Sequence, residues 1–426
     1  MSESYISHSP RNNLAQWLCY LETIHATEID LGLNRITQVA KRLAIDFSFA
    51  KVITVAGTNG KGTTCAFLEN AILAENKSVA VYSSPHIEKF NERLRINKVD
   101  IDDQSLIEAF DLIEEARGDI SLTYYEYTTL AAFIILTTLR PEFIILEVGL
   151  GGRLDATNMI DADIAVITTI DLDHQAFLGD SRELIGFEKA GIMRPHGLAV
   201  LGDTKPPLSI LKHAVAINAQ LKVRGKDFSV NTAISDWQWT FDRLSLKGLD
   251  KTNIPQDNVA TALSVLQLLN FELNSAKVNQ LIKATKVPGR TELFKGECDV
   301  LLDVAHNPQA AKYLEQYLID LIKSNKYQRI YGVVGMLADK DVVNTLSPMV
   351  ELIDEWYIGC LSVPRAATSE LISKQLKEIS PESKILNCFD NVGQAFKIAS
   401  KNVSRNDLIV VFGSFFTVAE IRRLLI

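Results

Sequence analysis

Apolar positions in the first half of the chain follow two alternating patterns. Segments with helical spacing, such as Asp102–Ala116, separate short apolar runs typical of buried strands at Val52–Ala56, Ser78–Tyr82, Phe143–Val148 and Ile164–Thr168. Helices that join parallel strands cover both faces of the sheet. The alternation therefore predicts an α/β fold with a doubly wound, mostly parallel sheet.

The pattern changes twice after this sheet. Between about Val223 and Leu246, short runs alternate apolar and polar residues, which predicts a small antiparallel insertion. Helical patterns follow over Gln256–Leu269 and Ser275–Thr285, and the segment Val287–Arg290 then breaks the periodicity. We predict a hinge there, with one domain over residues 1–287 and a second over residues 288–426.

The C-terminal part of the chain repeats the strand and helix alternation. Its strand-like runs are Val300–Val304, Ile330–Val334, Trp356–Gly359, Lys384–Cys388 and Leu408–Phe412. This predicts a smaller α/β domain. Ligands of such folds bind at the carboxyl ends of strands and between domains, so we expect this domain to bring a second substrate to the first.

Composition limits the classes of partner. A net charge of -8 without a long basic run argues against nucleic acid or an anionic membrane surface, and favours a small-molecule substrate. The apolar stretch Leu130–Leu139 is too short to span a bilayer, and Met1–Arg11 has no apolar signal core. Five scattered cysteines suit reduced thiols. We expect a soluble cytoplasmic protein.

Residues 57–64 read Gly-Thr-Asn-Gly-Lys-Gly-Thr-Thr, between a strand pattern and a helix pattern. Glycines let the backbone N–H groups approach phosphate oxygens, Lys61 adds a positive charge, and Thr63 or Thr64 adds a hydroxyl. Gly62 separates the lysine from the hydroxyl residue, unlike the usual GxxxxGK[ST] pattern. A simple glycine turn is the alternative, but the context predicts a phosphate-binding loop for ATP.

Polar residues also follow the next strands. Glu147 ends a buried strand, where a carboxylate needs a cation, so it predicts a Mg²⁺ ligand; a salt bridge to Lys61 or Arg153 is the alternative. Asp173-His174 follows another strand, and its histidine suits either a metal ligand or a capped loop equally. The segment Tyr82–His86 also follows a strand and offers a hydroxyl and an imidazole, but by itself it is better explained as a turn with a solvated histidine. Lys189, in the segment 188–192, is either a phosphate-neutralising cation or a helix C-terminal charge.

The second domain begins with a comparable cluster. Asp303 and His306 follow its first strand, where packing alone does not account for two polar side chains. We therefore predict a functional role for this pair.

In this order, the motifs resemble the folylpolyglutamate synthase family, and within it the bacterial bifunctional type; the family is related to the Mur ligases. The resemblance covers nearly the whole chain. Its segments are 57–63, 83–86, 124–127, 147–158, 173–174, 188–192, 288–290, 303–308, 339–341 and 413–415. Thr291 and Phe416 depart from residue types common in relatives, which puts detail of the second domain in doubt.

The resemblance implies an ATP-dependent ligase that joins L-glutamate to 7,8-dihydropteroate, giving dihydrofolate, and to reduced folates, giving polyglutamates. The substrate carboxylate would be activated as an acyl phosphate. A folylpolyglutamate synthase without the dihydropteroate activity is the alternative enzyme, and a nucleotide-dependent switch is the alternative outside catalysis. We expect a monomer.

The resemblance also implies roles for single residues. Lys61, Lys189 and His306 would serve catalysis, with Lys189 carbamylated by CO₂ and His306 placing the acyl phosphate or the glutamate. Mg²⁺ would be held by Ser83, Glu147 and His174. ATP would be bound by Gly57, Thr58, Asn59, Gly60, Lys61, Gly62, Thr63, Asn258, Arg290 and Asp303.

The pterin end of the substrate would bind in the first domain. The residues implied are Ile29, Asp30, Leu31, Gly32, Thr123, Tyr124, Tyr125, Glu126, Arg153, Leu154 and Asp155. An aromatic side chain can stack on a flat ring, and a carboxylate can accept hydrogen bonds from pterin N–H groups. The alternative for Tyr124–Tyr127 is a helix start.

Overall fold

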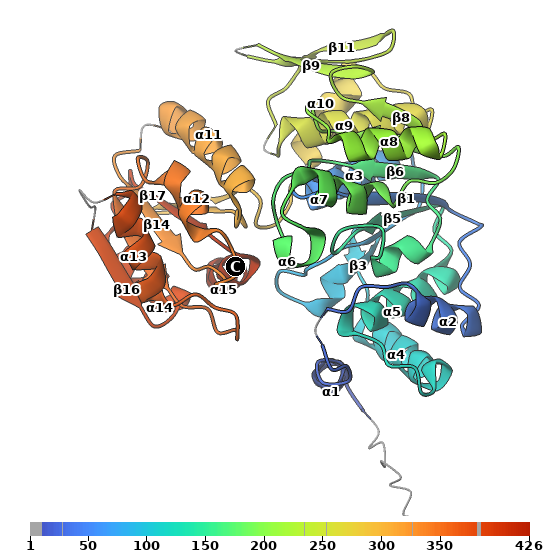
Figure 1. The fold of residues 1–426 in the computed structure, drawn as a ribbon. Coiled ribbons are helices and arrows are strands. Elements are labelled where there is room, and N and C mark those ends of the chain that lie inside the picture. Colours follow the sequence, from blue (N-terminus) through green and yellow to red (C-terminus); the bar gives the residue numbers. More distant parts are fainter. Residues whose placement is uncertain (1–10, 28, 234, 253, 326, 381–384) are drawn as a thin grey trace, which may run out of the picture.

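The protein is described by a computed structural model, which covers residues 11–27, 29–233, 235–252, 254–325, 327–380 and 385–426. The expected strand start at Lys384 and most of the segment 1–11 lie outside these residues. An eight-stranded sheet and a six-stranded sheet form the centres of two separate bodies (Figure 1).

The first sheet has eight strands in the order β4-β3-β2-β5-β1-β6-β7-β8. All neighbouring strands from β2 to β8 are parallel, whereas β3 and β4 extend one edge antiparallel. The mostly parallel fold expected from the sequence is therefore confirmed. The strands are β1 Lys51–Ala56, β2 Val79–Tyr82, β3 Leu94–Ile96, β4 Val99–Asp100, β5 Phe143–Glu147, β6 Ile164–Ile167, β7 Leu198–Leu201 and β8 Gln220–Val223.

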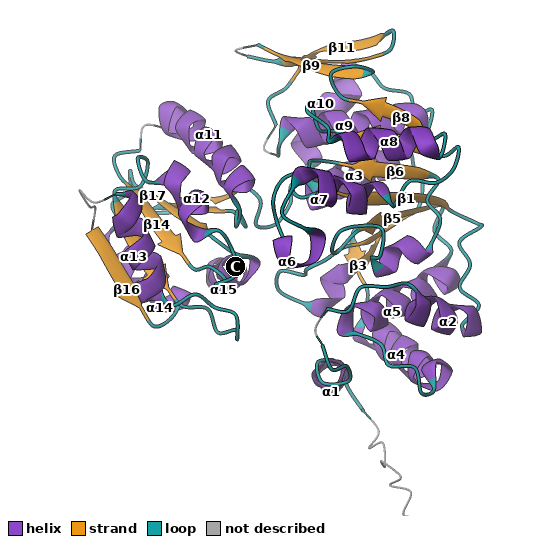
Figure 2. Ribbon diagram, in the orientation of Figure 1, coloured by secondary structure: helices purple, strands orange, loops and turns teal. Residues whose placement is uncertain are grey.

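Helices cover both faces of this sheet (Figure 2). Ile53 and Val55 pack with α3 and α9, whereas Val52 points to the opposite face and packs with α4 and α5, because successive side chains of a strand alternate. The helices are α1 Leu14–Leu21, α2 Asn34–Arg42, α3 Lys61–Ala74, α4 Asp103–Arg117, α5 Tyr124–Leu139, α6 Gln175–Leu178, α7 Arg182–Ala190, α8 Leu208–Ala216, α9 Gln256–Leu268 and α10 Ser275–Ala284.

The expected antiparallel insertion is confirmed. It is a three-stranded sheet of β9 Phe228–Thr232, β10 Trp237–Phe241 and β11 Leu244–Leu249. Its buried face carries Trp237, Trp239 and Phe241, which join the same core as α9 and α10. The insertion is therefore anchored on the helices that follow it in the chain.

The second sheet has six strands in the order β12-β13-β17-β14-β15-β16, of which only β12 is antiparallel. The strands are β12 Glu292–Phe294, β13 Asp299–Leu302, β14 Ile330–Val334, β15 Glu355–Gly359, β16 Ile385–Phe389 and β17 Leu408–Phe412. Its helices are α11 Pro308–Asn325, α12 Val342–Leu346, α13 Ser369–Ile379, α14 Val392–Asn402 and α15 Phe415–Leu425. The expected second α/β domain is thus present.

The segment Val287–Arg290, where we predict the hinge, lies in the connection between α10 and β12. The boundary between residues 287 and 288 stays a prediction. In the part of the chain that the structure describes, no helix has the length and apolar character needed to cross a membrane. The apolar stretch Leu130–Leu139 lies within α5.

Candidate functional site

The glycine-rich loop connects β1 to α3. Gly60 has a φ of 87°, and a Cβ there would lie 2.3 Å from Oδ1 of Asn258. A Cβ on Gly57 would lie 1.8 Å from Oγ1 of Thr168. Both positions therefore require glycine. The first N–H groups of α3 have no partner within the helix, which makes this loop suited to bind an anion.

Two side chains of the loop point back onto it. Lys61 Nζ donates to the carbonyl oxygens of Gly57, at 3.0 Å, and Thr58, at 3.4 Å. Burial lowers the pKa of Lys61, and the charges of Glu147 and Asp173 oppose this effect. A phosphate group would give this buried cation a further counter-charge.

Thr63 is held by Asn258, a residue of α9. The Thr63 hydroxyl donates to the Gly60 carbonyl oxygen at 3.0 Å and accepts from Asn258 Nδ2 at 2.6 Å. The Thr64 hydroxyl is buried without a hydrogen-bond partner in the described structure. Of the two threonines considered from the sequence, Thr63 is thus the one tied to the loop.

Glu147 lies at the end of β5, and β2 is a neighbouring strand of β5 in the sheet. The register pairs Tyr82 with Leu146, so Ser83 and Glu147 leave the sheet side by side. Burial raises the pKa of Glu147, and the charges of Lys61 and Arg290 oppose the rise. In the described structure no ion pair within 4.0 Å joins this carboxylate to Lys61 or to Arg153, which pairs with Glu188 at 2.8 Å.

A cavity of about 110 Å³ lies where the carboxyl ends of these strands meet the second domain. It joins the loop of residues 57–62 to Glu147 and His174, and the second domain adds Arg290, His306 and Phe415. Arg290 lies 5.1 Å from the ring centre of Phe415. Groups separated by more than 200 positions in the sequence therefore share one site.

Lys189 extends from α7 into the same cavity and is 4% exposed. Burial, followed by the nearby charge of Lys61, lowers the pKa of Lys189 to about 7, although Asp173 and Asp155 oppose the change. A neutral amine reacts with CO₂, whereas an ammonium does not. Carbamylation of Lys189 stays a prediction.

His174 precedes α6 in the left-handed backbone region, with a φ of 51°. Burial lowers the pKa of His174 to about 4, with Asp173 opposing and Lys340 adding to the effect. The imidazole is neutral near pH 7 and keeps a lone pair for a ligand. No three His, Cys, Asp or Glu side chains of the described residues form a metal site. Ser83, Glu147 and His174 therefore fit Mg²⁺ only as partial ligands beside phosphate oxygens.

Asp303 organises the start of the second domain. One carboxylate oxygen accepts from the Thr291 N–H and the other from the Ala305 N–H, both at 2.8 Å. Thr291 itself has a φ of 43°. His306 Nδ1 lies 2.8 Å from the Val304 carbonyl oxygen, and Nε2 faces the first domain. Phe416, the other departure from relatives, is 47% exposed.

The residues expected to bind the pterin are locally well ordered. Thr123 caps α5 and forms a capping box with Glu126, so the segment 124–127 is a helix start. Arg35 Nη1 donates to Asp30 at 2.7 Å, and Arg35 Nη2 lies 3.3 Å from Glu126. Their role in binding stays a prediction.

The Asp155 side chain forms hydrogen bonds within its own loop. Its carboxylate accepts from the backbone N–H groups of Gly149, Leu150 and Thr157 at 2.9 to 3.0 Å. The Tyr125 hydroxyl lies 3.5 Å from the same carboxylate. Leu31, Gly32, Tyr124 and Leu154 are half-buried. Asp155 therefore shapes this region whatever else it contacts.

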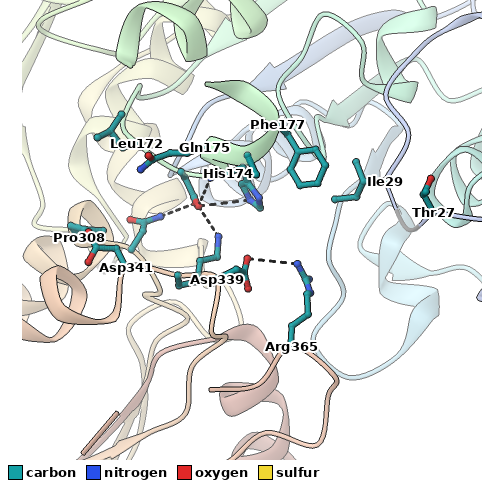
Figure 3. Close-up of a pocket in the computed structure, with 14 residues that line it drawn as sticks. Thr27, Ile29, Leu172, His174, Gln175, Phe177, Pro308, Asp339, Asp341 and Arg365 are labelled. Carbon is teal, nitrogen blue, oxygen red and sulfur yellow. Dashed lines mark hydrogen bonds and ion pairs between the residues drawn. The ribbon is translucent and has the colours of Figure 1, made fainter. Parts of the chain in front are cut away.

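A second pocket, of about 750 Å³, opens beside the cavity. Figure 3 shows Ile29, His174 and Phe177 of the first domain facing Asp339 and Arg365 of the second. Ile29 and the segment 339–341 belong to separate motifs of the sequence. Nothing in the sequence indicates that they lie on opposite walls of one pocket.

Family models match both halves of the chain. The model described as "Mur ligase middle domain" matches residues 55–243. The model described as "Mur ligase, glutamate ligase domain" matches residues 289–415. Together they cover most of the eight-stranded sheet and the whole six-stranded sheet.

Curated relatives match over almost the whole length. The chain is 42% identical to the dihydrofolate synthase/folylpolyglutamate synthase of Escherichia coli K12, over 96% of this chain and 94% of the relative. It is 39% identical to the protein of the same name from Haemophilus influenzae, over 96% of both chains.

Solved structures agree with these matches. E. coli FolC in complex with DHPP and ADP superposes with a TM-score of 0.91 at 41% identity, over 98% of both chains. A bifunctional folylpolyglutamate synthase/dihydrofolate synthase with Mn, AMPPNP and L-glutamate bound gives a TM-score of 0.88 at 42% identity, over 98% of both chains.

Proposed function

The chain belongs to the dihydrofolate synthase/folylpolyglutamate synthase family, and on this premise we propose that it ligates L-glutamate to 7,8-dihydropteroate and to reduced folates at the expense of ATP. One observation carries the proposal. Lys61 and Glu147 of the first domain and Arg290 and His306 of the second line a single cavity beside the phosphate loop.

The first chemical step is a phosphoryl transfer. A substrate carboxylate oxygen attacks the γ-phosphorus of ATP, the bond to ADP breaks, and an acyl phosphate results. Such a step requires charge neutralisation and in-line positioning more than proton transfer. Lys61 and the N–H groups at the start of α3 would bind the phosphates, and Arg290 would add a permanent positive charge from the second domain.

The second step is an acyl transfer. The amino group of L-glutamate attacks the acyl carbon, loses a proton, and displaces inorganic phosphate to leave an amide. His306 projects from the second domain into the cavity, where it would place the acyl phosphate or the glutamate. Asn258 would act from α9 by holding Thr63, and Asp303 by ordering the backbone next to Arg290.

Ser83, Glu147 and His174 would hold Mg²⁺, which when bound neutralises charge on the phosphate oxygens. Lys189 would be carbamylated: its nitrogen bonds to the carbon of CO₂ and releases a proton, which gives a carboxylate-like group. Its burial and the lowered pKa of about 7 support this modification.

The pterin would bind in the first domain near the residues between Ile29 and Gly32, with Thr123–Glu126 and Arg153–Asp155 beside them. The ion pairs of Arg35 to Asp30 and to Glu126 support this, because they connect two of the three segments. We also propose a cytoplasmic monomer that binds neither nucleic acid nor membrane. The five cysteines, all free in the structure, suit a reducing compartment.

The test is a mass-resolved assay with ATP, Mg²⁺ and L-glutamate. One reaction contains 7,8-dihydropteroate and the other tetrahydrofolate. Products one glutamate heavier in both reactions support the proposal. A product with tetrahydrofolate alone would favour a folylpolyglutamate synthase without the dihydropteroate activity, and no product in either would overturn the ligase assignment.

A further inference from the structure

A carboxylate of the first domain is held by three groups of the second. Asp173 follows β6, and its side chain is 10% exposed. Lys340 Nζ lies 2.6 Å from Oδ1. Asn307 Nδ2 lies 3.3 Å and His306 Nε2 lies 3.5 Å from Oδ2. Each of the three partners comes from a loop at the carboxyl end of a strand or at a helix start in the second domain.

The charges at this contact depend on one another. The Lys340 side chain is also 10% exposed. Two charges at this depth are costly when either lacks its partner. The pair is therefore formed only when the two domains are closed on each other.

Asn59 contacts the second domain through neutral groups. Asn59 Nδ2 donates to Gln309 at 2.6 Å and to Asn307 at 3.1 Å. A further ion pair, between Glu88 and Arg422, involves α15. Asp173 differs from Asn59 and Glu88 in its relation to the cavity. It precedes His174 in the chain and contacts His306, and these two histidines both line the cavity. It thus touches both halves of the site at once.

We propose that Asp173 and Lys340 are positioning residues that set the closed arrangement of the two domains and hold His306 over the phosphate loop. The proposal rests on the ligase function proposed above. Misplacing reacting groups by about 1 Å can cost about 10²-fold in rate. Loss of the pair should therefore lower kcat, whereas the KM for ATP should change little, because most of the groups proposed to bind ATP, the phosphate loop and Asn258, belong to the first domain.

The decisive variant is Lys340→Met, which keeps the length of the side chain and removes the charge. The matched control is Lys295→Met, because Lys295 also pairs with a carboxylate at 2.6 Å, that of Asp299, within the second domain. We expect Lys340→Met to lower kcat by about 10- to 100-fold and to change the KM for ATP by less than about threefold. Lys295→Met should leave both constants unchanged.

Small-angle scattering with AMPPNP reports closure independently of turnover. Lys340→Met should show a larger radius of gyration than the wild type and the control, at an unchanged thermal midpoint. Asp173→Asn should lower kcat similarly, and the double variant should be no worse than Lys340→Met alone, since both remove one interaction. If Asp173→Asn does not fold, Lys340→Met still decides the question.

Wild-type kcat and wild-type radius of gyration in Lys340→Met would overturn the proposal, as would an equal loss in Lys295→Met. If the wild-type protein forms no product, the ligase function fails. The scattering comparison with AMPPNP then tests the domain contact alone, and an unchanged radius in Lys340→Met would overturn that as well.

Discussion

Two glycines of the phosphate loop should respond to alanine in opposite ways. Gly60 has a φ of 87°, and a Cβ there would lie 2.3 Å from Asn258 Oδ1 and 2.7 Å from its Nδ2. A Cβ on Gly62 would instead lie 3.8 Å from both carboxylate oxygens of Glu147, which is an ordinary contact. The two substitutions are chemically identical and lie two positions apart.

The cost at Gly60 has three sources. The left-handed backbone costs about 1–2 kcal/mol for a residue with a Cβ. Relieving the clash requires Asn258 to move in a packed interior, which costs about 1–3 kcal/mol. That movement breaks the hydrogen bond from Asn258 to Thr63, worth about 1 kcal/mol. We therefore expect Gly60→Ala to lower the free energy of unfolding by about 3–6 kcal/mol, against about 0.5 kcal/mol or less for Gly62→Ala.

The assay is urea unfolding without nucleotide, followed by calorimetric titration with ATP. Gly60→Ala should unfold at lower urea and bind ATP poorly. Gly62→Ala should unfold as the wild type does, yet lose turnover, because its methyl group points toward Glu147 where the metal is proposed to bind. Equal midpoints for the two variants would refute the reasoning, since they would show that the loop tolerates a Cβ facing Asn258.

Three further outcomes test the chemistry. Lys61→Ala should abolish product formation in the mass-resolved assay at an unchanged thermal midpoint; near-wild-type turnover would exclude the phosphate-loop role. Glu147→Gln keeps the shape but removes the charge, and a Mg²⁺ titration of turnover should shift to higher concentration; an unchanged titration would exclude the ligand role. The pKa of Lys189 is lowered to about 7, so its amine is neutral above that pH and protonated below it. A ¹³C-carbamate NMR signal from labelled bicarbonate should therefore grow as pH rises through about 7 and vanish in Lys189→Met; a signal retained in that variant would place it elsewhere.

The fold of both domains was largely predictable because each buried strand is a run of apolar residues with its own signal. The expected strands at Ile330–Val334 and Leu408–Phe412 match β14 and β17 residue for residue. Outside the antiparallel insertion, the strands β3, β4, β7, β8 and β12 were not identified from the sequence. Of these, β3, β4 and β12 have two or three residues each, too few to show a period.

The candidate site was predictable only where one continuous segment of the sequence contains the motif. The loop around Lys61 and the strand end at Glu147 are of this kind. The ion pair of Lys340 with Asp173 is not, because it spans 167 positions and depends on how one domain closes on the other. For Asp155 the structure adds a local role that the sequence did not show, because both carboxylate oxygens accept hydrogen bonds within its own loop. Its role in pterin binding stays a prediction.

The order of the strands in each sheet explains which residues meet in the proposed site. In the first sheet β2, β5, β1 and β6 are consecutive neighbours, so the residues that follow them converge at one edge: Ser83, Glu147, Lys61 and His174. In the second sheet β13, β17 and β14 are neighbours, and the segments after them supply His306, Phe415 and Lys340. Each edge is fixed by its own hydrogen-bonded ladder, whereas the relation between the edges depends on side-chain contacts such as Asp173 with Lys340. The placement of the reacting groups should therefore be most sensitive to substitutions at the contact of Asp173 with Lys340. Nucleotide binding should instead be most sensitive to substitutions in the phosphate loop.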